Sequence, residues 1–292
     1  MRYGPIITAM VTPFNDDLSV DYDQAAALAV HLVEHGSDGL VVTGTTGESS
    51  TLTVAESAEL YKVVMAAVGD RATIIAGSGA NSTAEAVFLT QAAERAGVHA
   101  SLQVAPYYNK PSQEGFYQHF KTVAANTSLP LFLYNIPGRT AKNVEAATII
   151  RLAEVPNIIG IKEASGDLEQ VSRIVRETED DFLLYSGDDF LTLPIVALGG
   201  VGVISVASHL AGPDMKHMIE AYQAGQVAEA REIHFGLMDL FKALFIAPNP
   251  APVKAALGMS GFPVGGVRLP LVTVTDDEAA QIKTALGQLE LA

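Results

Sequence analysis

The chain has 292 residues, a net charge of −15 and no cysteine. The lack of cysteine excludes disulfides, thiolate zinc sites and a cysteine nucleophile. Lys and Arg are scattered singly through an acidic chain, which argues against nucleic acid as a partner. The apolar runs are short and interrupted, so we expect no membrane span, and the N-terminus shows no signal peptide, so we expect a cytoplasmic protein.

Length alone does not separate one α/β barrel from two smaller domains, but the order of the elements does. Short β-rich runs lie at residues 5–12, 39–44, 72–77, 100–106, 130–135, 158–164, 182–187 and 202–206. Most of them are continuously apolar, as expected for strands that are covered on both faces. Amphipathic helical patterns lie between them, at residues 22–35, 54–68, 82–96, 113–126, 144–154 and 168–178. This alternation predicts a (β/α)8 TIM barrel, with an open doubly wound sheet as the alternative.

The pattern changes after residue 206 and becomes mostly helical, with joints rich in proline and glycine. One helix is enough to complete the barrel, and the remaining length exceeds it. We therefore predict a catalytic barrel over residues 1–225 and a C-terminal helical appendage over residues 226–292.

A single lysine, Lys162, lies near the end of the apolar run 158–164. An ammonium group in such surroundings costs free energy unless it is paired or loses its proton. A lysine that is kept neutral is a nucleophile for carbonyl carbon. The alternative is a lysine that reaches the rim of the sheet or pairs with an acid.

The ends of other expected strands carry groups that would meet Lys162 at the mouth of a barrel. Thr45 and Thr46 lie in a glycine-flanked turn that can offer N–H groups and hydroxyls to a carboxylate, although an ordinary βα turn would look similar. Tyr134 could transfer protons to and from a carbinolamine, or it could be a core tyrosine. Arg139 suits carboxylate recognition, or it could be a solvated loop residue.

Signals for a metal or an organic cofactor are weak. The glycine-rich segment 77–82 lacks both the third glycine of a dinucleotide loop and the lysine of a P-loop. The histidines show no metal-binding spacing. Asp188 and Asp189 could bind a cation, but loop capping is the favoured interpretation. We expect neither a metal nor a cofactor.

Three motifs in this order resemble the signatures of one family. The segments 44–48 (Gly-Thr-Thr-Gly-Glu), 134–137 (Tyr-Asn-Ile-Pro) and 159–163 (Ile-Gly-Ile-Lys-Glu) are similar to those of the dihydrodipicolinate synthase / N-acetylneuraminate lyase group of class I aldolases. The likeness extends over essentially the whole chain. Thr46, Arg139 with Thr140, and the segment 106–111 favour the synthase branch of the group.

The resemblance implies a mechanism and a set of roles. Lys162 would form a Schiff base with pyruvate, and the resulting enamine would attack the aldehyde of L-aspartate 4-semialdehyde, in lysine biosynthesis through diaminopimelate. It implies a proton relay of Tyr134, Thr45 and Tyr108, with Tyr108 supplied by a neighbouring subunit of a homotetramer built as a dimer of dimers. It also implies substrate binding by the backbone of Thr45 and Thr46, by Arg139, and by the carbonyls of Gly187 and Ile204.

Two alternatives stay open. One is another pyruvate-dependent aldolase of the same family, acting on a 2-keto-3-deoxy sugar acid or on 4-hydroxy-2-oxoglutarate. The other is a non-catalytic barrel that binds an oxo acid.

The chain also departs from the family in two places. Synthases that are inhibited by lysine resemble one another in having two histidines in an allosteric pocket, and Val54 and Ser57 stand at the matching positions here. Asn81, Glu85 and Tyr107 do match that pocket. Because both histidines are replaced, we expect weak or absent inhibition by lysine. Ala247 stands where a glutamate is frequent, and we assign no effect to this difference.

Overall fold

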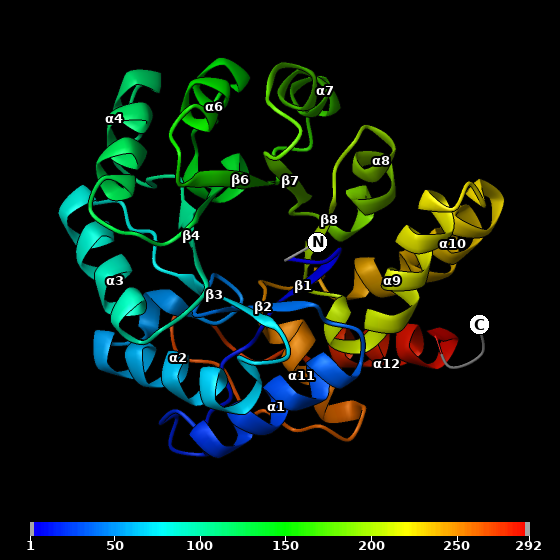
Figure 1. The fold of residues 1–292 in the computed structure, drawn as a ribbon. Helices are drawn as coiled ribbons and strands as arrows, with labels where there is room; N and C mark the ends of the chain where they lie inside the picture. The colour runs from blue at the N-terminus through cyan, green and yellow to red at the C-terminus, as the bar shows by residue number, and fades with distance from the viewer. Residues whose placement is uncertain (1–2, 290–292) are drawn as a thin grey trace.

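The computed structural model describes residues 3–289. Eight parallel strands close into a barrel in chain order, and pairing of β1 with β8 completes the ring (Figure 1). The strands are β1 Ile6–Ala9, β2 Gly39–Val42, β3 Thr73–Gly77, β4 Ala100–Val104, β5 Leu131–Asn135, β6 Ile158–Glu163, β7 Leu183–Ser186 and β8 Gly202–Ser205. The prediction of a TIM barrel is confirmed, and the open doubly wound sheet is excluded.

Helices cover the outer face of this barrel. They are α1 Tyr22–Glu34, α2 Val54–Val68, α3 Thr83–Arg95, α4 Gln113–Ala124, α6 Ala146–Ala153, α7 Leu168–Glu177 and α8 Thr192–Ala197. The short α5 Pro137–Thr140 instead follows the end of β5 directly. Two 3-10 turns, η1 Ser49–Thr51 and η2 Asp189–Leu191, follow β2 and β7. Local sequence explains the helix starts: Thr53 and Glu56 form a reciprocal capping box at α2, and Ser82 accepts the Glu85 amide at α3.

The strands are buried on both faces because two apolar layers meet them. The inner layer fills the barrel with side chains such as Ile7, Phe132, Tyr134, Tyr185 and Ile204. The outer layer lies between the strands and the helices and extends into the C-terminal helices. This double burial is why the strands read as continuous apolar runs rather than as alternating ones.

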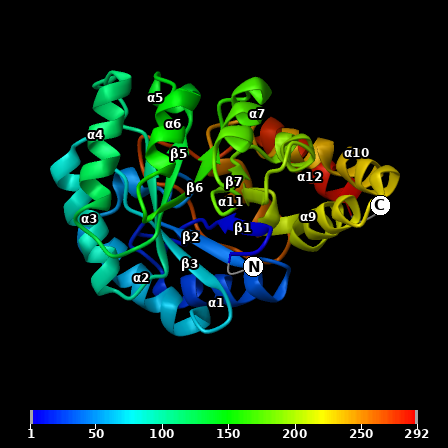
Figure 2. The same ribbon diagram turned by 45° about the horizontal axis from the view of Figure 1, so that its top comes forward.

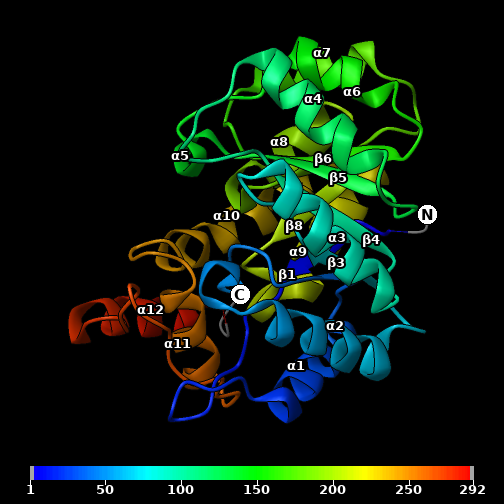
Figure 3. The same ribbon diagram turned by 90° about the vertical axis from the view of Figure 1, so that its left-hand side faces the viewer.

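Four further helices follow β8: α9 Ser208–Gln223, α10 Val227–Ala243, α11 Ala251–Met259 and α12 Asp276–Leu289. Figure 2 shows α9, α10 and α12 on the side of the barrel away from α3 and α4. Figure 3 shows α11 and α12, in orange and red, at the same end of the barrel as α5, which follows a strand end. Helices α11 and α12 therefore lie beside the mouth of the barrel. The division at residue 225 stays a prediction.

A membrane-crossing helix is absent from residues 3–289, because no helix there combines sufficient length with sufficient apolarity.

Candidate active site

Lys162 lies on β6 with only 6% of its surface exposed. Burial lowers the pKa of its ammonium to about 8; the negative charge of Asp189 opposes this shift, and the positive charge of Arg139 adds to it. No carboxylate among residues 3–289 forms an ion pair with Lys162. A lysine that reaches the rim of the sheet or pairs with an acid is therefore disfavoured, and roughly a tenth of the amine is neutral at pH 7.

Tyr134 is the neighbour of Lys162 across the β5–β6 ladder. The Lys162 Nζ lies 4.6 Å from the centroid of the Tyr134 ring. Burial raises the pKa of the Tyr134 phenol to about 12, while the positive charge of Arg139 and a hydrogen bond with the Thr45 side chain act against the increase. The amine, the phenol and the Thr45 hydroxyl thus form a connected group at the ends of three strands.

The turn that follows β2 places Thr45 and Thr46 at this site. The turn is tight, and Thr43 and Glu48 at its two ends both have positive φ, 55° and 57°. It packs so closely on β3 that a Cβ added at Gly77 would lie 2.5 Å from the Thr43 carbonyl oxygen. Within the described chain, the amides of Thr45 and Thr46 have no hydrogen-bond acceptor. Two free N–H groups in one turn are suited to a carboxylate.

A cavity of about 530 Å³ opens beside this group. Thr45, Ile136, Arg139 and Thr140 line one part of it, and Val54, Ser57, Glu85 and Tyr107 line another. Arg139 belongs to the short α5 and is exposed, so its guanidinium is free to meet an anion in the cavity. Lys162 and Tyr134 are not among the lining residues, whereas Thr45 is, so the cavity meets this group at Thr45.

Gly187 and Ile204 complete the surroundings of the lysine. A Cβ at Gly187 would lie 3.1 Å from both Cγ and Cε of Lys162, so a side chain there would crowd the amine. Ile204 on β8 is 1% exposed and belongs to the inner layer of the barrel.

Tyr108 is the one expected catalytic residue that a single chain does not bring to the site. Its side chain is 89% exposed and does not line the cavity. Its φ of 70° is strained for a residue with a Cβ. A large aromatic side chain held outward in this way is suited to a contact with another molecule.

Sequence reasoning missed part of the role of Asp189. The expected capping role is found at Asp188, whose carboxylate accepts the Phe190 backbone N–H at 2.9 Å. Asp189 is 2% exposed, accepts the amides of Val206 and Ala207 at 3.2 and 2.9 Å, and acts electrostatically on Lys162. Its place in the turn after β7, the strand that neighbours β6, was the available signal. In the described part of the chain, no group of three or more His, Asp or Glu side chains is arranged around a metal position.

A closed barrel with a buried, pKa-lowered lysine beside a tyrosine defines a lyase of the class I aldolase type. The chain belongs to the dihydrodipicolinate synthetase family, whose model matches residues 2–289. This finding confirms the family and the enzyme class inferred from the sequence.

Individual relatives are similar over the full length. The 4-hydroxy-tetrahydrodipicolinate synthase of Moorella thermoacetica is 57% identical over 291 residues, which are 100% of both chains. The enzyme of the same name from Bacillus subtilis is 52% identical over 290 residues, 99% of this chain and 100% of the relative. The structure of DHDPS from Cyanidioschyzon merolae with lysine bound has a TM-score of 0.98 and 52% identity, covering 99% of each chain.

Proposed function

We propose that the protein acts as a 4-hydroxy-tetrahydrodipicolinate synthase that condenses pyruvate with L-aspartate 4-semialdehyde through Lys162, in lysine biosynthesis by the diaminopimelate route. The observation that carries the assignment of Lys162 is its position: a 6% exposed amine with a pKa of about 8, 4.6 Å from the Tyr134 ring centroid. Full-length similarity to synthases supports the choice of reaction.

The reaction begins with addition of the neutral Lys162 amine to the ketone carbon of pyruvate. The carbinolamine loses water to give an imine, and loss of a methyl proton gives an enamine. The enamine carbon attacks the aldehyde, and the amine of the second substrate then adds to the imine carbon and displaces lysine. Tyr134 and Thr45 are joined by a hydrogen bond and have the chemistry to move the required protons.

Binding roles follow from charge and from free donors. The amides of Thr45 and Thr46 are assigned to the pyruvate carboxylate, because neither has an acceptor in the described chain. Arg139 is assigned to the carboxylate of the aldehyde substrate, since it is an exposed cation at the cavity. Gly187 and Ile204 are assigned to the wall of the pyruvate pocket.

Borohydride trapping tests the role of the lysine. The protein is incubated with pyruvate and reduced, and the added mass is located by peptide mass spectrometry. An adduct on Lys162 is the expected result; a folded protein that gives no adduct would remove Lys162 as the nucleophile. Condensation with aspartate semialdehyde, compared with cleavage of keto-deoxy sugar acids and of 4-hydroxy-2-oxoglutarate, then separates the synthase from the family's other aldolases.

Tyr108 is proposed to complete the relay in a neighbouring subunit of a homotetramer, since its strained, exposed side chain lies outside its own cavity. Subunit complementation tests this. Lys162→Ala and Tyr108→Phe are each expected to be nearly inactive, but a heterodimer of the two contains one site with both Lys162 and Tyr108. After random reassociation about one site in four should be active, because a two-fold dimer has reciprocal contacts. No recovery in mixtures shown by mass to contain heterodimers would contradict the proposal.

A further inference from the structure

The turn that carries Thr45 and Thr46 ends at Glu48, and Glu48 is held by a residue far along the chain. Its Oε1 lies 2.7 Å from the Nζ of Lys254 on α11. The two side chains are 1% and 3% exposed, so the ion pair is removed from water. Neither partner has been assigned a role in the chemistry.

Lys254 is enclosed on its other sides as well. Its ammonium donates to the Gly266 carbonyl at 2.7 Å and lies 4.1 Å from the centroid of the Phe14 ring. Burial lowers its pKa, and the charge and hydrogen bond of Glu48 oppose that shift. The amine thus has three fixed contacts and little freedom to move away from the turn.

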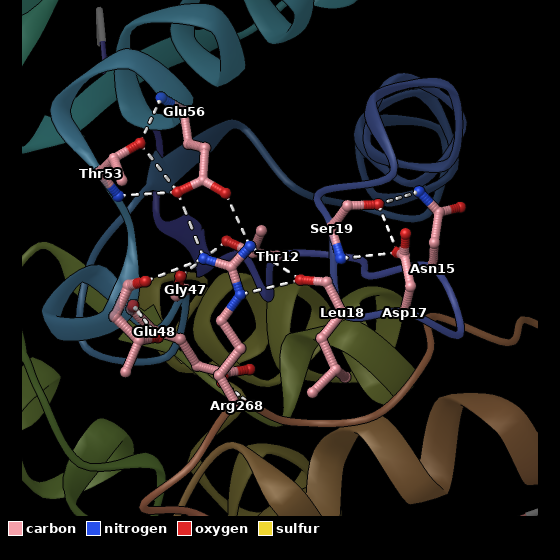
Figure 4. A network of polar contacts seen from close by, with 11 residues as sticks. Thr12, Asn15, Asp17, Leu18, Ser19, Gly47, Glu48, Thr53, Glu56 and Arg268 are labelled. Carbon is pink, nitrogen blue, oxygen red and sulfur yellow. Dashed lines mark hydrogen bonds and ion pairs between the residues drawn. The ribbon is translucent and has the colours of Figure 1, made fainter.

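The second carboxylate oxygen of Glu48 is also bound by the C-terminal segment. It accepts the backbone N–H of Arg268 at 2.9 Å. The Arg268 guanidinium reaches Glu56 at the start of α2, and it also donates to the carbonyls of Leu18 and Thr51 (Figure 4). Residues 254–268 of the C-terminal segment therefore contact the connection between β2 and α2 at Glu48 and Thr51, and the first turn of α2 at Glu56.

A direct contact links this segment to the substrate-binding side of the turn. Asn249 precedes α11 and is 6% exposed, and its side-chain Nδ2 donates to the Thr46 hydroxyl oxygen at 2.9 Å. With that oxygen already accepting a bond, the Thr46 O–H is left to donate elsewhere. On the opposite side, the Thr12 hydroxyl donates to the Gly47 carbonyl at 2.6 Å.

Stability alone is a weak reason for a buried ion pair. Desolvation of two charges offsets most of their attraction, and a well-packed apolar pair is commonly as stable. A fixed ion pair does impose one geometry on what it joins, and here it joins the residue two positions from Thr46 to a rigid helix. Small displacements of binding groups have large effects on binding and rate.

We propose that Lys254 is a positioning residue for pyruvate: through Glu48 it fixes the turn so that the amides of Thr45 and Thr46 face the carboxylate beside Lys162. This inference rests on the proposed function. The C-terminal segment is then part of the pyruvate site, although none of its charged groups touches the reacting atoms.

The test compares Lys254→Met with Lys216→Met. Lys216 forms a 2.6 Å ion pair with Asp38, which accepts the Ile6 amide at the start of β1, so the control breaks an ion pair at the other end of the barrel. In borohydride trapping, Lys254→Met should raise the pyruvate concentration for half-maximal adduct by about tenfold or more. The adduct should still form at saturating pyruvate, and the KM for aspartate semialdehyde should change less than twofold. Lys216→Met should leave the pyruvate dependence unchanged.

Hydrogen–deuterium exchange supplies a readout that does not require catalysis. Amides of residues 43–50 should exchange faster in Lys254→Met than in Lys216→Met. If Lys254→Met does not fold, Glu48→Gln takes its place. The glutamine keeps a side-chain carbonyl oxygen that can accept the Arg268 N–H, and the variant should shift the pyruvate dependence in the same direction. Unchanged half-saturation in a folded variant would overturn the inference alone, whereas no adduct in the wild-type protein would overturn the proposed function and this inference with it.

Discussion

Tyr134 and Lys162 are paired across β5 and β6, and the lysine nitrogen lies 4.6 Å from the centroid of the phenol ring. Burial moves their pKa values in opposite directions, to about 12 for the phenol and about 8 for the amine. As pH rises, the amine therefore loses its proton well before the phenol does. Between these two pKa values, a neutral amine lies beside a phenol that still carries its proton.

Replacing Tyr134 by phenylalanine should therefore remove proton transfer while keeping the ring in place. We expect kcat to fall by about 100-fold or more, the range associated with a lost general acid–base group. Tyr185→Phe is the matched control, because its hydroxyl is also within the barrel but donates to the Gly4 carbonyl at 2.7 Å. That variant should lose about 1 kcal/mol of stability and little activity. Equal losses of kcat in the two variants would contradict the assignment.

The pKa of Lys162 predicts the pH dependence of pyruvate capture. Only the neutral amine attacks, so at limiting pyruvate the rate of adduct formation should increase about tenfold per pH unit below 8 and level off above it. The positive charge of Arg139 lowers this pKa. Arg139→Gln should consequently move the midpoint to higher pH. Stopped trapping reactions between pH 6 and 10 measure both curves; a midpoint that moves to lower pH in the variant would be inconsistent with the charge effect.

Arg139 should also separate the two substrates. Arg139→Gln is expected to raise the KM for aspartate semialdehyde at least about tenfold, because a charge-assisted bond to its carboxylate is lost. Trapping of pyruvate above pH 9 should be nearly unchanged. Arg151→Gln, which removes an exposed arginine paired with Glu114 at 3.1 Å, is the control and should leave both substrates unaffected. If Arg139→Gln impaired pyruvate trapping more than it raised the KM for aspartate semialdehyde, the assignment of Arg139 to the carboxylate of the aldehyde substrate would be wrong.

The sequence predicts what is local, and it misses what depends on pairing across the chain. Lys162 was recognisable because an isolated charge in an apolar strand is anomalous on its own. The capping box of Thr53 and Glu56 is equally local, because its two members are three residues apart in the sequence. The ion pair of Glu48 with Lys254 joins residues far apart in sequence. From the sequence alone each would be predicted to lie on the surface, and only the fold shows that both are removed from water.

Inhibition by lysine is expected to be weak or absent. Val54 and Ser57 line the cavity together with Glu85 and Tyr107, but the valine side chain has no hydrogen-bonding group where the family resemblance implies a histidine. A titration of lysine against the condensation rate measures this. Half-inhibition at sub-millimolar lysine would show the expectation to be wrong. The double variant Val54→His and Ser57→His should bind lysine more tightly than the wild-type protein does.

The Glu56–Arg268 pair should make the stability of the protein depend on pH. The hydrogen bond from Arg268 lowers the pKa of Glu56 to about 2. Burial opposes this shift, and the N–H and hydroxyl of Thr53 contribute in the same direction as Arg268. A carboxyl whose pKa is lowered on folding stabilises the native state above its unfolded pKa, near 4.5, and that contribution is lost as pH falls towards 2. The two side chains are 22% and 17% exposed, so solvent screening reduces the effect.

Glu56→Gln should cost about 1–2 kcal/mol in urea unfolding at pH 7, and the difference from wild type should shrink steadily between pH 4.5 and pH 2.5. Glu59→Gln, which breaks an exposed 3.2 Å pair with Lys62 on the same helix, should cost less than about 0.5 kcal/mol at pH 7. A Glu56→Gln difference that stays constant down to pH 2.5 would mean that lost packing, rather than lost charge, causes the destabilisation.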